Sequence, residues 1–182
     1  ALTPSATGTG VFTIASPATN TDRTLTLPDE AGTVLTSASS ITQNAGPAFS
    51  AYPSGNQSIT TSTSTKVTLD IEDFDTNSNF ASSRFTPTVA GYYQINGGCN
   101  GGASASSMTR SFAKLHKNGT EWKRGTDSSP SGTNGQSVVS SIVYLNGTTD
   151  YIELYMWITA TGPIISYGRT VCYLDGALVR AA

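Results

Sequence analysis

Short strand-like segments separated by turn residues recur along this chain of 182 residues, and helical patterns are nearly absent. No window of a dozen residues carries apolar side chains at the 3.6-residue period of an α-helix. β-Branched residues and glycine, which disfavour helices, occur throughout. The sequence therefore predicts an all-β fold. The expected strands are residues 48–52, 66–71, 84–88, 91–99, 108–117, 121–124, 137–145, 151–159 and 170–179.

Tight and long connections alternate between these strands. The tight ones contain Ala90-Gly91, Asn118-Gly119 and Asn146-Gly147, and an Asn-Gly pair favours a hairpin because both residues tolerate positive φ. The long ones are Asn100–Ser107, Gly125–Gln136 and Ala160–Arg169. If consecutive strands run up and down, the tight turns and the C-terminus lie at one end of the fold, and the long loops lie at the other.

The first forty residues contain few large apolar side chains and are predicted to differ from the rest. Short alternating segments at 11–15, 23–28 and 33–36 cannot bury enough surface to fold alone. They can fold if identical copies wrap round one another and share a thin core. Residues 37–40 are typical of a linker. We therefore expect a fibre or stalk segment over residues 1–40 and a head domain over residues 41–182.

The charge of the chain argues against one class of partner. Ten Lys and Arg against twelve Asp and Glu give a net charge of −2, with no clustered basic segment. Nucleic-acid binding needs such a basic surface, so we expect no nucleic-acid partner. No apolar run approaches the ~20 residues that span a bilayer, so we expect no membrane insertion. The first ten residues also lack the pattern of a secretory signal peptide.

An ordered set of motifs over residues 46–182 resembles the globular head of complement component 1q. Phe85, Gly91, Tyr93 and Ile95 have the spacing of its central motif. The further matches are Phe74-Asp75, Asn79-Phe80, Lys117-Asn118-Gly119, residues 145–154 and residues 172–179. The resemblance implies a ten-stranded antiparallel jelly-roll sandwich of the tumour necrosis factor class, which assembles as a trimer.

Residues 151–158 form an expected strand with two apolar faces, one aliphatic and one aromatic. A solvated sheet face is polar, so the aromatic face is expected to be covered by another sheet or another subunit. Together with the core-poor N-terminal segment, this strand predicts a homotrimer. The residues assigned to the trimer interface are Tyr93, Tyr151, Tyr155 and Trp157.

Residues 22–35 carry a second resemblance. Asp22 to Asp29, followed by Ala31-Gly32-Thr33-Val34-Leu35, is similar to a segment common in phage tail fibres, where it forms a short intertwined three-chain β-structure. With a trimeric head, this resemblance implies a virion protein assembled in the host cytoplasm. Its implied partners are the rest of the tail fibre or virion and a host cell-surface glycan or protein.

The two cysteines, Cys99 and Cys172, have no neighbouring Cys or His of a zinc site. Buried thiols and a single disulfide are the two alternatives. In the topology of the resembling family, the strands that carry them are neighbours in one sheet, so the sulfurs can be near each other. Because a virion protein assembles in a reducing cytosol, we expect free thiols.

No residue set indicates catalysis. His116 is the only histidine, no nucleophile motif accompanies it, and its place beside a hairpin indicates a surface or packing role. Asp73 and Asp75 begin the pattern of an EF-hand, but Ser78 replaces its Gly and Arg84 replaces its bidentate Glu. We expect no cofactor and a solvated acidic loop paired with Arg84. The alternative is a looser calcium site at Asp73 and Asp75, as at the trimer axis of some members of the resembling family.

The long loops carry aromatic rings and planar polar groups, which are the side chains that hold sugars. Candidate receptor-binding residues are Asp127, Asn134, Ile164, Tyr167 and Arg169. The alternative is that Ile164, Ile165 and Tyr167 pack inward or against a neighbouring subunit.

Three functions are compatible with these observations. The resemblances favour a non-enzymatic phage tail fibre or receptor-binding head that attaches to a host surface ligand through its distal loops. The runner-up is a head-fibre, collar or decoration trimer that binds no ligand. A polysaccharide-degrading enzyme is a third hypothesis, for which no pair of carboxylates in a glycosidase context is found.

Overall fold

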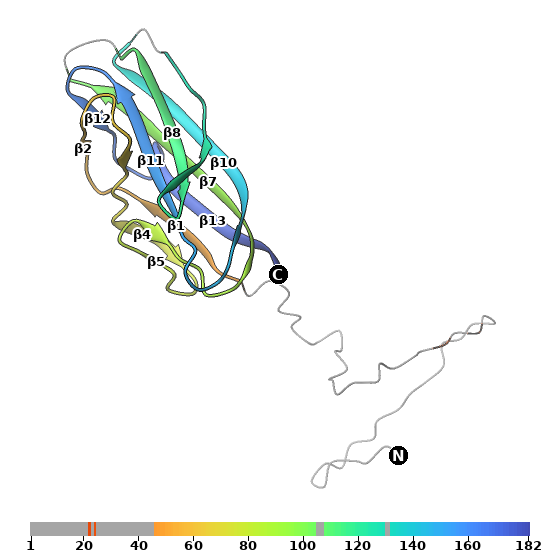
Figure 1. Cartoon of the computed structure of the whole chain (residues 1–182). Helices are drawn as coiled ribbons and strands as arrows, with labels where there is room; N and C mark the ends of the chain where they lie inside the picture. Colours follow the sequence, from red (N-terminus) through yellow and green to blue (C-terminus); the bar gives the residue numbers. More distant parts are fainter. Residues whose placement is uncertain (1–21, 23, 25–45, 105–107, 130–131) are drawn as a thin grey trace. The chain divides into compact units, whose positions relative to one another are not determined.

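The computed structural model describes Asp22, Thr24 and residues 46–104, 108–129 and 132–182 (Figure 1). The chain divides into two units, residues 1–41 and 42–182. All described strands belong to the second unit, which we call the head. The predicted stalk strands lie outside the described residues, so the intertwined stalk and the domain boundary at residue 40 stay predictions.

The head consists of two antiparallel sheets packed against each other (Figure 1). Sheet A follows the order β2–β12–β7–β13–β1–β4, and β10 also pairs with β7. Its strands are β1 (Ala48–Tyr52), β2 (Gln57–Ser58), β4 (Ile71–Asp75), β7 (Gly91–Ala103), β10 (Asn134–Leu145), β12 (Pro163–Ile165) and β13 (Cys172–Ala181). The central strand is therefore β7, with β10 on one side and β12 and β13 on the other.

Sheet B follows the order β5–β6–β11–β8–β9, and β3 also pairs with β11. Its strands are β3 (Thr65–Lys66), β5 (Phe80–Ala81), β6 (Arg84–Phe85), β8 (Arg110–Lys117), β9 (Thr120–Arg124) and β11 (Ile152–Thr159). The described residues contain no helix, so none is long and apolar enough to cross a bilayer. The predicted all-β, antiparallel class is confirmed.

The tight turns and the C-terminus lie at one end of the head, which we call the base. Asn118 and Gly119 join β8 to β9 with φ values of 52° and 78°, the positive values for which the Asn-Gly pair was expected. At the same end, Ala182 N donates to Ala90 O at 3.0 Å. The connections after β7, β9 and β11 reach the opposite, distal end (Figure 1). The predicted polarity of turns and loops is confirmed.

Two glycines at the base are required by close approach of the backbone. A Cβ on Gly91 would lie 2.5 Å from the carbonyl oxygen of Arg180. Gly147 has a φ of 73°, and a Cβ there would collide with the backbone nitrogen of Ala90. No other residue fits either position without moving the neighbouring backbone.

The core lies between the sheets and includes an aromatic cluster near the base. On β11 the alternate residues Ile152, Leu154, Met156 and Ile158 are fully buried. Phe49 of β1 stacks on Phe85 of β6 with ring centroids 4.2 Å apart. Tyr93 of β7 meets Phe85 edge-on at 5.5 Å. The cluster thus joins sheet A to sheet B.

Several strand boundaries differ from the prediction. The expected strand 66–71 is split between β3 and β4, because Leu69 turns into the core and the Ser83 hydroxyl bonds its backbone N and O at 2.8 and 3.2 Å. Strands β7 and β10 extend into the predicted long loops, and β12 forms within the third one. The distal loops are therefore shorter than the sequence indicates.

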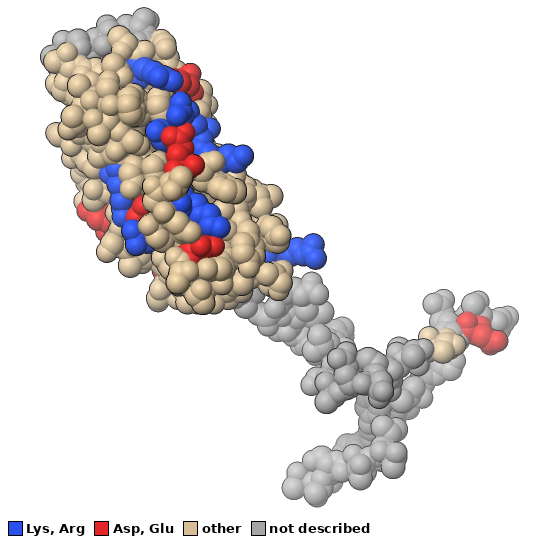
Figure 2. Space-filling model, viewed as in Figure 1, with Lys and Arg blue, Asp and Glu red and all other residues tan. Residues whose placement is uncertain are grey.

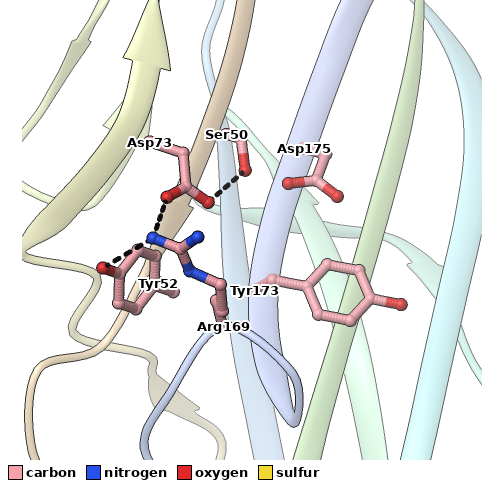
Figure 3. Close-up of a pocket in the computed structure, with 6 residues that line it drawn as sticks. All are labelled: Ser50, Tyr52, Asp73, Arg169, Tyr173 and Asp175. Carbon is pink, nitrogen blue, oxygen red and sulfur yellow. Dashed lines mark hydrogen bonds and ion pairs between the residues drawn. The ribbon is translucent and has the colours of Figure 1, made fainter.

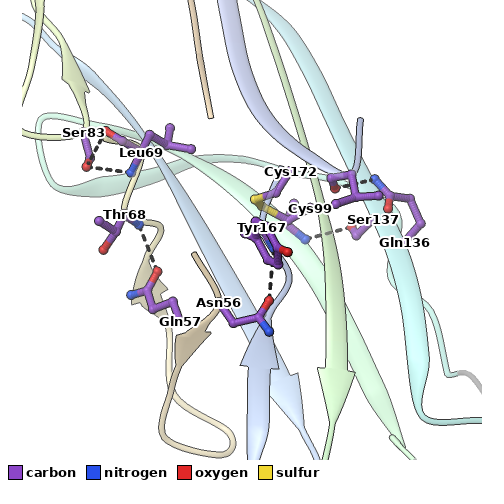
Figure 4. Close-up of a disulfide and its surroundings, with 12 residues drawn as sticks. Asn56, Gln57, Thr68, Leu69, Ser83, Cys99, Gln136, Ser137, Tyr167 and Cys172 are labelled. Atoms are coloured by element: carbon purple, nitrogen blue, oxygen red, sulfur yellow. Dashed lines mark hydrogen bonds between the residues drawn. A yellow bond between two sulfur atoms is a disulfide. The ribbon is translucent and has the colours of Figure 1, made fainter. Parts of the chain in front are cut away.

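The prediction of free thiols is wrong, because Cys99 and Cys172 form a disulfide (Figure 4). They are directly opposite each other on β7 and β13, with Cα atoms 4.0 Å apart. The hydrogen bond from Asn100 N to Val171 O flanks them, which makes theirs a non-hydrogen-bonded pair, the register in which facing side chains are closest. A reducing cytosol favours free thiols, but the pairing of β7 with β13 places the two cysteines opposite each other.

Candidate functional site

A pocket of about 170 Å³ opens on sheet A where β4, β1 and β13 run side by side (Figure 3). Strand β1 contributes Ser50 and Tyr52, β4 contributes Asp73, and β13 contributes Tyr173 and Asp175. Arg169 reaches it from the turn that precedes β13. Because residues two apart share a sheet face, the alternation of each strand aims these side chains into one place.

Arg169 lies between Asp73 and Tyr52 in this pocket (Figure 3). Its Nη2 is 2.6 Å from Asp73 Oδ1 and donates to the Tyr52 hydroxyl at 3.4 Å. The hydrogen bond to Tyr52 and then the charge of Asp73 raise the pKa of Arg169. The guanidinium is thereby held against sheet A, and it is not free to reach toward the distal end.

Asp175 is the pocket's second carboxyl group. Its Oδ1 is buried and has no hydrogen-bond partner among the described residues. Burial raises the pKa of Asp175, the hydroxyl of Ser50 opposes this, and the negative charge of Asp73 adds to the rise. Two tyrosine rings and a carboxyl group without a counter-charge suit the binding of small polar groups.

The structure uses both calcium candidates for other contacts. Asp73 pairs with Arg169, whereas Asp75 accepts hydrogen bonds from the backbone N of Phe80 at 2.7 Å and of Asn77 at 3.3 Å. No group of three or more His, Cys, Asp or Glu able to hold a metal occurs in the part of the chain that is described. The expected pairing of the acidic loop with Arg84 is wrong, because Arg84 reaches Glu153 instead.

The five candidate receptor-binding residues do not form one site. Asn134 and Ile164 lie on either side of Gly102, since both pair with it in sheet A near the distal end. Asp127 binds Arg110 on sheet B, with Nη2 and Oδ2 2.6 Å apart. Tyr167 is 56% exposed beside the connection between β1 and β2, where its backbone N donates to Asn56 Oδ1 at 3.2 Å (Figure 4). Their role in binding stays a prediction.

Tyr93 is not available for a subunit interface, which corrects its assignment. Its side chain is fully buried, its hydroxyl donates to Val89 O at 2.7 Å, and burial raises the pKa of Tyr93 to about 12. On β7 the odd-numbered residues near the base face the core, so the adjacent Tyr92 faces solvent instead. The sequence could not distinguish these two neighbouring tyrosines.

The other three assigned interface residues, Tyr151, Tyr155 and Trp157, lie partly exposed on the outer face of sheet B. Side chains of the same chain cover this face. Arg84 Cζ is 3.8 Å from the Tyr151 ring centroid, and Lys114 Nζ is 5.4 Å from that of Trp157. The aromatic face of β11 therefore does not by itself require a second subunit, and contact with one stays a prediction.

His116 has a packing position, as the sequence indicates. The residue is 8% exposed, and its ring stacks on Tyr155 with centroids 3.8 Å apart. Its Nδ1 lies 3.3 Å from Gly119 O, and its Nε2 has no hydrogen-bond partner in the described part of the chain. Burial lowers the pKa of His116, which favours the neutral ring.

Glu153 is a buried carboxylate on the outer face of sheet B, with a side chain only 3% exposed. Lys66 and Arg84 both contact its Oε1, at 2.8 and 2.9 Å. Burial alone would raise the pKa of Glu153, but the hydrogen bonds and charges of the two cations outweigh it and lower the pKa. The carboxylate is thus ionised in the fold over a wider pH range than in the unfolded chain.

We expect Glu153→Gln to destabilise the head at pH 7 by ~1–2 kcal/mol, since the two cations would lose their shared partner but remain partly solvated. A lowered folded-state pKa stabilises the fold above the ordinary glutamate pKa of about 4.3, and this contribution is lost as the pH falls through the lowered value. Urea midpoints at pH 7 and pH 2 measure the effect. A difference that persists at pH 2 would contradict this account.

One surface feature was missed by the sequence reasoning. Four large apolar side chains are exposed on the outer face of sheet A near the base, and we call them the base patch: Tyr92, Ile142, Tyr144 and Val179. Tyr92 pairs with Tyr144 in the ladder, with ring centroids 5.5 Å apart. Val138, Ile142 and Tyr144 lie on one face of β10, and this spacing of apolar residues could have revealed the base patch.

Three solved structures share this architecture. The globular domain of zebrafish complement 1qA covers 75% of this chain and 99% of its own, with 14% identity and a TM-score of 0.56. Eiger TNF from S. frugiperda covers 75% and 93%, with 10% identity and a TM-score of 0.57. Murine APRIL covers 73% and 98%, with 12% identity and a TM-score of 0.53.

No protein-family model and no curated protein sequence matches the chain. At identities this low, the structural likeness shows the fold and leaves function open. The head is an antiparallel jelly roll of the C1q and tumour necrosis factor type, which confirms the predicted fold class.

Proposed function

We propose that this chain is the homotrimeric head of a phage tail fibre, and that it attaches the virion to a host cell-surface ligand without enzymatic activity. The base patch is the observation that carries the proposal. A solvated sheet face is normally polar, and a cluster of large apolar side chains on one marks an association surface. The C1q-like and TNF-like fold favours two further copies of this chain as the molecules that cover the base patch.

The position of the base patch supports self-association. It spans the adjacent strands β10, β7 and β13, of which β10 forms an edge of sheet A, and Tyr92, Ile142 and Val179 line one hollow there. Farther toward the distal end the same face carries a mutually bonded polar row, in which Gln94 Nε2 donates to Ser140 Oγ at 2.7 Å. Apolar and satisfied polar groups on one flat face are typical of interfaces between copies.

The position of the chain ends at the base supports host attachment through the opposite end of the head. The head begins at Gly46 beside the C-terminal strand, since Leu178 N donates to Pro47 O at 3.0 Å. Both ends of the head are therefore at the base, and the distal loops and sheet flanks are left for recognition. Three copies on one axis also convert weak single-site binding into avidity.

We expect Ile142→Asp to give a species of one chain mass, 18.9 kDa, where the unchanged protein has three times that mass. The reason is that assembly would desolvate a carboxylate placed among the apolar side chains of the base patch. Light scattering after size exclusion measures it. Phe74→Asp is the matched control, since Phe74 is similarly exposed but lies on β4 at the far edge of sheet A. A stable wild-type monomer at micromolar concentration would overturn the assembly.

Adsorption of the purified head to host cells tests attachment. A trimer that competes with phage for host cells supports the attachment head. A trimer that never adsorbs supports the runner-up, a head-fibre, collar or decoration protein, and release of reducing sugar from host envelopes would support an enzyme.

A further inference from the structure

We propose that the outer face of sheet B is a docking surface for an acidic polysaccharide, an inference that rests on the proposed attachment function and names its ligand class. Lysine and arginine gather along this face, with carboxylates between them (Figure 2). By the pairing and alternation of their strands, five cations lie on this face: Lys66, Arg84, Arg110, Lys114 and Arg124. We call them the cation face.

The cation face carries excess positive charge in a head that is neutral as a whole. Residues 46–182 contain nine Lys and Arg and nine Asp and Glu. Five of those cations but only three of those carboxylates, Glu121, Asp127 and Glu153, belong to this face. Two positive charges are therefore in excess there, and β4 with its neighbours carries most of the balancing acids. A dipolar head of this kind orients toward an anionic partner.

The excess arises because cations share acceptors. Lys66 and Arg84 share Glu153 alone. Arg124 and Lys114 share Glu121, at 2.9 and 2.7 Å. Each shared carboxylate leaves one cation with unused hydrogen-bond donors.

Lys123 lies beside the cation face, at the open edge of sheet B, because it is opposite Leu115 in the ladder. It is exposed and has no carboxylate partner among the described residues, and its Nζ is 5.9 Å from the ring centroid of Trp122. Trp122 is itself 45% exposed, so an aromatic ring and an ammonium group without a counter-charge stand together next to the cation face.

Aromatic rings hold the guanidinium groups in place. Arg110 and Arg124 lie over the ring of Phe112, with Cζ atoms 4.9 and 4.6 Å from its centroid. These planar groups are fixed before any ligand arrives, so binding costs little side-chain entropy. Both are nearly half exposed, which leaves N–H groups open to solvent.

The length and spacing of the cation face favour a polymer with sparse charges. Along β8 it runs from Arg110 to Lys114, about 13 Å at the usual rise of a strand, and Lys66 and Arg84 extend it beyond β11 on strands β3 and β6. A nucleic acid carries a charge every ~1.7 Å of duplex and requires a continuous basic surface. Here carboxylates interrupt the cations, and this pattern fits a glycan in which charged residues alternate with neutral ones.

The test is binding of the intact trimer to dextran sulfate, to polygalacturonate and to uncharged dextran, followed by calorimetry at rising salt. We expect binding to the two charged polymers only, weakening as salt rises. The variant Arg110→Gln/Lys123→Gln/Arg124→Gln should lose affinity by roughly tenfold or more, since three charge-assisted contacts per subunit are removed. Lys123→Gln alone should weaken binding, whereas Arg23→Gln, which removes an equal charge outside the head, should not.

Equal binding to uncharged dextran, stronger binding to single-stranded DNA, or equal losses in Lys123→Gln and Arg23→Gln would overturn the inference. Failure of the proposed function gives a different result. A trimer that adsorbs to host cells but ignores the charged polymers refutes only the cation face. A protein that binds the polymers but never adsorbs to host cells refutes the attachment role.

Discussion

Phe85→Ala is expected to destabilise the head by about 3–5 kcal/mol, the range for removing a fully buried aromatic side chain. Phe85 is fully buried between the sheets, where it contacts Phe49 of β1 and Tyr93 of β7. It sits on β6, where it pairs with Ile152 of β11 and with Phe80 of β5. Urea unfolding at fixed protein concentration measures the change.

Phe74→Ala is the matched control for this prediction. Phe74 is 51% exposed, so its removal should change the free energy of unfolding by less than about 1 kcal/mol. Equal effects of the two substitutions would mean that the aromatic cluster does not join the sheets.

The second large effect concerns the disulfide. Cys99→Ala/Cys172→Ala should lower the free energy of unfolding by about 4 kcal/mol, because the bond closes a loop with a sequence separation of 73 residues and so restricts the unfolded chain. Reductant present during unfolding should bring the unchanged protein to the same midpoint as the variant. Both sulfurs are fully buried, so native protein should resist reduction until it opens.

Mass spectrometry under non-reducing conditions distinguishes the disulfide from two thiols. A mass lower by two hydrogens than the thiol form supports the bond. A protein with two free thiols, whose urea midpoint does not respond to reductant, would contradict it.

The fold was predictable because its determinants are local. The Asn118-Gly119 turn needs positive φ at two successive positions. Aliphatic side chains at every second position of residues 152–158 indicate a strand, whichever strands lie beside it. The split of residues 66–71 was not predictable, because a hydroxyl 14 residues away, that of Ser83, takes the backbone bonds of Leu69.

The site was less predictable because it depends on partners distant in sequence. Arg84 follows an acidic stretch, yet its partner is Glu153, 69 residues away. Arg169 was expected on a loop, yet Asp73 and Tyr52 hold it against sheet A. The register that opposes Cys99 and Cys172 is likewise set by the whole pairing of β7 with β13.

Two glycines at the base, Gly91 and Gly147, fix the paths of the turns that close the head. A Cβ at Gly91 would lie 2.5 Å from Arg180 O and one at Gly147 would collide with Ala90 N, so a side chain at either position displaces a neighbouring segment of backbone. Gly132, in the connection after β9, has open space around it and accepts a side chain without a clash. A substitution at Gly132 therefore alters only the loop that carries it, whereas one at Gly91 or Gly147 forces apart two segments that are distant in sequence.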